Sequence, residues 1–130
     1  MKISTAILVI CLANTLQGQD IDGANILLEN RLHNFGDVFE SDRKEHAFQI
    51  MNSGNEPLVL ANVLTSCGCT ATQWPKIPVA PGQSATISVL FNSTGKKGNQ
   101  KKIITILSNA INGREELEII AHVLPRRSDL

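Results

Sequence analysis

The sequence has few aromatic side chains and no excess charge of either sign. Its 130 residues include no tyrosine, one tryptophan and four phenylalanines, so few rings can stack on nucleic-acid bases or sugars. Twelve basic residues balance twelve acidic residues. A chain without net charge has no long-range field that would attract nucleic acid or a charged substrate. We therefore expect no nucleic-acid partner.

The motifs of common hydrolases are also missing from the sequence. No serine is framed by glycines and no His-Glu-x-x-His pattern occurs. The Asp and Glu residues are scattered over segments expected to be turns or solvent-facing positions. These absences predict that the protein is not an enzyme. At this length the chain can form one domain with a hydrophobic core and needs no disulfide framework to fold.

The N-terminal segment has the layout of a secretory signal. Lys2 precedes an apolar segment at residues 3–12, which is too short to span a bilayer, and small and polar residues follow. We predict a signal peptide at residues 1–18, and hence an exported protein in the periplasm, at the cell surface or outside the cell. The alternative is a lipoprotein signal with Cys11 lipidated, although Ile10 stands where a small residue is typical. Membrane attachment is expected only in that case.

The rest of the chain shows the alternation of β-strands rather than the periodicity of helices. Apolar and polar residues alternate most clearly at residues 85–91, 44–51 and 117–123. Residues 58–64 are apolar on both faces except at Asn62, which predicts a central strand. With turn signals between the segments, the pattern predicts an all-β fold, an immunoglobulin-like β-sandwich of seven to eight strands. We place this domain at residues 32–124, followed by a loose polar tail at residues 125–130.

Three turn signals are specific enough to predict backbone geometry. Gly36 predicts a turn or bulge early in the domain. Pro81-Gly82 predicts a type II turn, because proline fixes one φ and glycine accepts a positive one. Asn112-Gly113 is the preferred central pair of a type I′ hairpin, and we expect that turn between the last two strands.

Five short motifs together resemble one bacterial family. They are Phe35-Gly36-Asp37-Val38, Phe48-Gln49-Ile50-Met51-Asn52-Ser53-Gly54, Pro57-Leu58-Val59-Leu60, Ser66-Cys67-Gly68-Cys69-Thr70 and Val79-Ala80-Pro81-Gly82. The family is secreted, of unknown function, immunoglobulin-like, and similar to the ASH/Hydin and major-sperm-protein group of domains. The resemblance covers residues 32–123. It implies a seven-stranded, exported sandwich with no established catalytic activity and no active site to carry over.

Cys67 and Cys69, separated only by Gly68, are the sharpest candidate site, and three interpretations stay open. A structural pair would form a local disulfide or two buried thiols that hold the loop after residues 58–64. A redox pair would exchange thiols with a partner, although no helix follows to lower a thiol pKa. A metal-binding pair would suit Cu(I), because thiolates are soft ligands, or Zn(II) with two further ligands. We expect no cofactor, and copper held by Cys67 and Cys69 is the alternative.

Two further features are candidates for partner binding. Lys96 and Lys97 lie in a glycine-bracketed loop and form a basic hairpin tip with Lys101 and Lys102. The tip could bind phosphate or an acidic glycan, but the simpler interpretation is that lysines at a strand end prevent edge-to-edge pairing. Trp74 is either an exposed anchor for a partner or a lid over one end of the sandwich, and its apolar neighbours favour the lid.

The sequence thus predicts an exported, non-enzymatic immunoglobulin-like module that acts in binding or as a scaffold. The expected ligand is another protein, recognised through loops or a strand edge. The alternative function is a thiol-based copper-binding or redox protein that uses Cys67 and Cys69.

Overall fold

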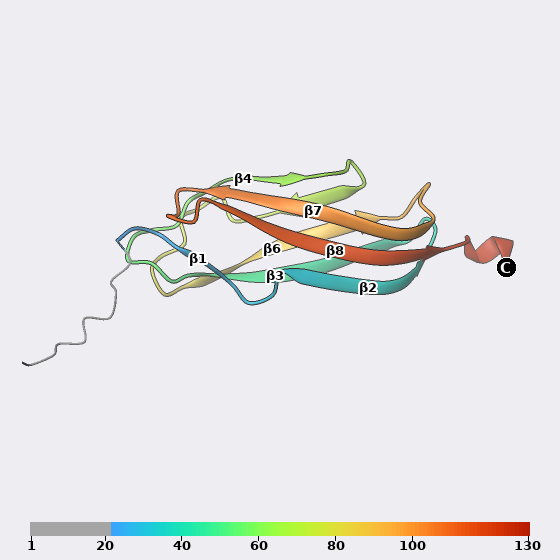
Figure 1. Cartoon of the computed structure of the whole chain (residues 1–130), viewed down its shortest axis with the longest axis horizontal. Coiled ribbons are helices and arrows are strands. Elements are labelled where there is room, and N and C mark those ends of the chain that lie inside the picture. The colour runs from blue at the N-terminus through green and yellow to red at the C-terminus, as the bar shows by residue number, and fades with distance from the viewer. Residues whose placement is uncertain (1–21) are drawn as a thin grey trace, which may run out of the picture.

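Residues 22–130, the part of the chain that the computed structural model describes, form two four-stranded sheets packed face to face (Figure 1). The predicted signal peptide and Cys11 lie outside the described residues. The strands are β1 (Ile26–Leu28), β2 (Leu32–Phe39), β3 (Arg43–Asn52), β4 (Leu60–Thr65), β5 (Thr70–Gln73), β6 (Ser84–Asn92), β7 (Gly98–Ser108) and β8 (Arg114–Leu124), followed by a 3-10 helix, η1 (Arg127–Asp129). The predicted all-β sandwich is confirmed. Within residues 22–130 no helix is long and apolar enough to cross a membrane.

The first two strands belong to different sheets. The first sheet has the order β1-β3-β6-β5 and the second the order β2-β8-β7-β4. β1 pairs antiparallel with the end of β3, after which the chain crosses over and β2 pairs parallel with β8. β1 precedes residue 32, the expected start of the domain, so the sandwich also includes a strand before that boundary.

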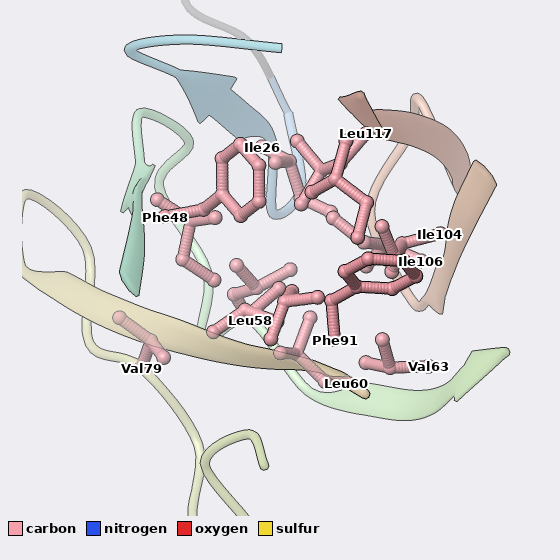
Figure 2. Close-up of a cluster of buried hydrophobic side chains, with 14 of the residues drawn as sticks. Ile26, Phe48, Leu58, Leu60, Val63, Val79, Phe91, Ile104, Ile106 and Leu117 are labelled. Carbon is pink, nitrogen blue, oxygen red and sulfur yellow. The ribbon is translucent and has the colours of Figure 1, made fainter. Parts of the chain in front are cut away.

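The inner faces of the two sheets form the hydrophobic core. The alternation predicted from the sequence is present, because Phe48 in β3 and Ile87 in β6 are fully buried while their strand neighbours turn outward. Side chains from both sheets point toward one another in Figure 2, among them Phe48 of the first sheet and Ile104 and Leu117 of the second. Burial of each large apolar side chain contributes about 1.5–3 kcal/mol. The core, and not the cysteine pair, therefore holds the sheets together.

The segment predicted to be a central strand is an edge strand. In the described part of the chain β4 pairs with β7 alone, with an irregularity between Leu60 and Asn62. Val63 is buried, but Leu64 on the opposite face is 46% exposed. The prediction is wrong because an apolar residue on the outer face of an edge strand leaves the same pattern in the sequence as a residue buried between two layers.

Two of the three predicted turns are confirmed. The Gln83 N–H donates to the Ala80 carbonyl at 3.0 Å and Gly82 has φ +77°, as a type II turn requires. Gly36 has φ +70° where the register of β2 against β8 shifts between Asn34 and Asp37, which is the expected bulge.

The connection between β7 and β8 differs from the prediction. Neither Asn112 nor Gly113 has a positive φ, and a type I′ turn needs positive φ at both central residues. A longer loop, residues 109–113, joins the strands instead. The Asn112 side chain accepts a hydrogen bond from the Ile26 N–H at 3.0 Å and donates to the Ile26 carbonyl at 2.8 Å. Asn112 thus attaches β1 to this loop, a long-range role that a local turn motif does not reveal.

The C-terminal tail, expected to be loose, makes specific contacts. Arg126 donates to the Glu40 carboxylate at 2.9 Å. The guanidinium of Arg127 lies 4.4 Å from the ring centroid of Phe39 and 3.6 Å from the Asp42 carboxylate. The tail is therefore attached to the turn between β2 and β3.

Candidate functional site

The chain changes sheets at the cysteine motif. β4 ends at Thr65 in the second sheet, β5 begins at Thr70 in the first, and a disulfide joins Cys67 to Cys69 between them. The Thr65 hydroxyl donates to the carbonyls of Cys67 at 3.1 Å and Thr70 at 3.3 Å. The Thr70 N–H donates to the Cys67 carbonyl at 3.2 Å. The bridge and these hydrogen bonds together fix the crossing between the sheets.

The disulfide lies at the surface of the core. Cys69 packs partly against the core, whereas Gly68 is exposed at the tip of the loop. Gly68 has no positive φ, and a Cβ added there would meet no atom within 4 Å. Neither conformation nor packing therefore requires a glycine at this position. No group of three or more His, Cys, Asp or Glu residues that could hold a metal occurs within residues 22–130.

The change of sheet leaves half of β7 with one unpaired edge. β4 pairs with residues 104–108 of β7, and the Ser66 N–H donates to the Ile103 carbonyl at 3.0 Å. Among the strands of residues 22–130, β8 alone pairs with residues 98–102. In Figure 1, β4 ends part-way along β7 and the chain turns back into β5, while β7 runs on. We call residues 98–102 the open edge of β7.

Two residues present their backbone groups at the open edge. Ile103 directs both its N–H and its carbonyl toward Ser66. In an antiparallel ladder this direction alternates from one residue to the next. Lys101 and Asn99 therefore direct their N–H and carbonyl groups to the same side, where no residue of the described chain 22–130 pairs with them. An edge of this kind can accept a strand from another chain.

The sandwich separates its charges from side to side, although its net charge is zero. Residues 57–113, which include β4, β5, β6 and β7, contain five lysines and no Asp or Glu. The other described residues, 22–56 and 114–130, contain eleven acidic and six basic residues. β6 and β5 are neighbours in one sheet and β7 and β4 in the other, so one side of both sheets is basic. The balanced charge of the whole chain concealed this separation.

Lysines lie at and beside the open edge. The Lys101 side chain is 66% exposed and its Nζ lies 3.4 Å from the Glu118 carboxylate on β8. Strand alternation puts Lys102 on the face of β7 that also carries the buried Ile104. Lys96 and Lys97, two of the predicted partner-binding residues, precede β7 in the β6–β7 loop. The predicted role of these lysines in guarding a strand edge fits this position.

A shallow hollow borders the open edge on the outer face of the second sheet. It has a volume of about 390 Å³, and Asn99 and Lys101 lie in its lining together with residues of the β2 bulge and of β8. On β8, His122 Nδ1 lies 3.1 Å from the Asp37 carboxylate. A strand added to the open edge would therefore lie beside a polar depression.

Trp74, the third predicted partner-binding residue, lies away from the open edge. It follows β5 in the first sheet and packs partly against the core. The Lys76 Nζ lies 3.0 Å from its ring centroid, so one face of the indole is covered by a cation. This position fits a lid better than an exposed anchor.

Two histidines stack on the opposite side of the sandwich. The rings of His33 in β2 and His46 in β3 lie 3.6 Å apart with an interplanar angle of 9°. Burial lowers the pKa of His33 below its usual 6.5, and the positive charge of His46 lowers it further. The stacked contact between β2 and β3 therefore favours the neutral form of His33.

The fold is similar to that of several solved domains. They include a protein of unknown function from Porphyromonas gingivalis W83 (17% identity, TM-score 0.69, 84% of this chain and 51% of that one) and the ASH/PapD-like domain 7 of human CEP192 (7% identity, TM-score 0.67, 98% and 99%). A third is the E. coli chaperone DraB (8% identity, TM-score 0.59, 77% and 56%). The chain spans about half the length of the P. gingivalis protein. Proteases are also among the similar structures, and the chain covers 31% or less of each.

These similarities confirm the predicted immunoglobulin-like β-sandwich fold. A more specific match identifies the family. Residues 26–123 match the family described as protein of unknown function (DUF1573), and the chain belongs to that family. No curated protein sequence matches the chain. The predicted resemblance to an immunoglobulin-like family of unknown function is thus confirmed, and the match starts at β1.

Proposed function

We propose that this protein is an exported, non-enzymatic module that binds another protein through the open edge of β7. The observation that carries the proposal is the unpaired half of an otherwise paired strand, where Asn99 and Lys101 present backbone donors and acceptors. Extended peptides add to such edges by main-chain hydrogen bonds. The similarity to a bacterial chaperone and to an ASH domain supports a binding role, and the layout of residues 1–18 supports export.

Unpaired strand edges promote aggregation, so proteins that keep such an edge limit its pairing with other chains. The open edge of β7 is short, and lysines lie in it and in the loop before it. Both properties limit unselective pairing while they leave the backbone accessible. The edge is thus suited to a selective partner.

Cross-linking at a single position in the cell of origin tests the proposal. A photo-reactive residue replaces Asn99 at the open edge or, as the matched control, Ala47, which is exposed on β3 in the other sheet. We expect the chain outside the cytoplasm without residues 1–18, and a discrete adduct with one other protein from position 99 but not from position 47. Equal adducts from both positions, or none from position 99, would contradict binding at the edge. A chain that stays in the cytoplasm would contradict export.

A further inference from the structure

The lysines beside the open edge have few acidic neighbours in the protein itself. Of Lys96, Lys97, Lys101 and Lys102, Lys101 alone lies within 4.0 Å of a carboxylate of residues 22–130, in an exposed ion pair with Glu118. Exposed pairs of this kind are weak. Residues 57–113 contain no Asp or Glu, so β4 and the rest of β7 add no counter-charge. A partner with acidic side chains would supply the charge that this side lacks.

The backbone groups of the open edge select a polypeptide among acidic ligands. Asn99 and Lys101 each offer a donor and an acceptor, about 7 Å apart along the strand. A phosphate or carboxylate group only accepts hydrogen bonds and would leave both carbonyls unpaired. Another strand supplies a donor and an acceptor at each position. The edge therefore suits an extended peptide better than a ligand that offers it only phosphate or carboxylate oxygens.

We infer that the segment bound at the open edge is an extended strand with acidic residues opposite Lys101 and Lys102. The inference rests on the proposed function and adds the chemical class of the bound segment. In a β-ladder the residue opposite Lys101 projects beside it from the same face, and the next residue of the added strand projects beside Lys102 from the other face. Two adjacent acidic residues would therefore meet both lysines, on the two faces of the sheet.

The same lysines exclude the simplest alternative occupant. If two copies of the protein paired through their β7 edges, Lys101 and Lys102 of one copy would lie near those of the other. Like charges across a ladder are destabilising. The acidic side of a second copy stays an alternative, and the experiment below separates it from a different protein.

The test uses the purified full-length chain and a display library of random eight-residue peptides. We expect enrichment of peptides with adjacent Asp or Glu residues, with binding that weakens as salt is added. The Lys101→Glu variant should bind them at least about tenfold more weakly. The Lys76→Glu variant, with the same change of net charge on the Trp74 loop, should bind within about twofold of the unaltered chain.

Backbone pairing is tested separately from charge. Lys101→Pro removes the N–H that points to the open side and no N–H of the β8 ladder, whereas Lys101→Ala keeps it. We expect proline to abolish binding and alanine to weaken it only in part. If Lys101→Pro fails to fold, amide hydrogen exchange in the unaltered chain replaces it. Bound peptide should then slow the exchange of the Asn99 and Lys101 amides.

The possible outcomes have distinct consequences. Neutral or basic peptides that bind at the edge would overturn the inference and leave the proposed function intact. Peptides that bind Lys101→Pro as well as the unaltered chain, with no slowing at Lys101, would overturn edge binding itself. Failure to enrich any peptide would overturn the inference, while cross-linking from position 99 still decides the proposed function. Self-association that Lys101→Glu abolishes would assign the edge to a second copy and overturn the inference.

Discussion

Asn52, at the end of β3, offers the sharpest test of how the fold is held. Its side chain is fully buried. The amide Nδ2 donates to the carbonyls of Glu56 at 2.7 Å and Val79 at 2.9 Å. The Oδ1 accepts from the N–H groups of Gly54 at 3.0 Å and Asn25 at 3.3 Å. One side chain thus joins the segment before β1, the turn after β3 and the segment before β6.

The Asn52→Ala variant should be less stable by about 2–4 kcal/mol. The Val79 carbonyl keeps a hydrogen bond from the Leu58 N–H at 2.9 Å, so its loss is small. The Glu56 carbonyl and the N–H groups of Gly54 and Asn25 lose the partner that Asn52 provides. Each lost hydrogen bond lowers the free energy of unfolding by about 0.5–1.5 kcal/mol, and by more where the remaining group stays buried. Together these losses give the range of about 2–4 kcal/mol. Urea unfolding measures the difference.

The Asn52→Asp variant should be less stable than the Asn52→Ala variant at pH 7. It has nearly the same shape, but a carboxylate oxygen would face the Glu56 and Val79 carbonyls. Burial and this repulsion raise the carboxyl pKa in the folded state above its unfolded value of about 3.9. The protonated acid is therefore favoured by folding, and relative stability falls as the pH rises through the folded pKa.

The matched control for these variants is Asn62→Ala. Asn62 is exposed on β4, and within residues 22–130 its Oδ1 accepts only from the adjacent Val63 N–H, at 2.9 Å. Stability should therefore change by less than about 0.5 kcal/mol. An Asn52→Ala cost as small as that of the control would refute the assigned role. If the loss of stability caused by Asn52→Asp does not grow between pH 4 and pH 7, position 52 does not face the Glu56 and Val79 carbonyls as described.

Three further predictions concern the other sites. Replacing Cys67 and Cys69 by serine should leave peptide binding at the open edge intact. It should lower the free energy of unfolding only slightly, because the bridge closes a very short loop. Lost activity in a copper- or oxidant-stress assay would instead favour the thiol hypothesis. Because the pKa of His33 is lowered on folding, stability should fall as the pH drops below 6.5. His33→Gln should flatten this fall in thermal unfolding, and an unchanged pH dependence would contradict the burial of His33. Hydrogen bonds from Arg126, Gly95 and Ser41 lower the pKa of Glu40 to about 2. The contribution of Glu40 to stability is therefore full above pH 4.5 and lost as the pH falls toward 2. Arg126→Ala should raise this pKa in an NMR titration, and an unchanged value would contradict the contact.

The sequence predicts those features that depend on neighbouring residues. The alternation in β3 and β6 and the glycines at positions 36 and 82 have local causes, namely strand geometry and positive φ, and the structure confirms them. The role of Asn112 was missed because its partner Ile26 lies 86 residues away. A motif that specifies a turn by local preference cannot show such a contact.

Strand order is the part of the fold that the sequence conceals. Residues 58–64 and 101–107 have similar apolar patterns, yet β4 lies at an edge and β7 lies inside the sheet. The pairing of a strand depends on where the chain leaves the sheet, and here it leaves at Ser66. The lysines and the absence of acidic residues in 57–113 are visible in the sequence. Only the structure places them beside an unpaired edge.

Amide hydrogen exchange at Asn99 and Lys101 tests the central claim most directly, first in the free protein and then with the partner recovered by cross-linking. The open edge predicts rapid exchange of both amides in the free chain, while the amide of Lys102, which points toward β8, exchanges slowly. In the complex, Asn99 and Lys101 should become protected. If both amides are already slow in the free protein, or stay fast in the complex, the open edge of β7 is not the binding site.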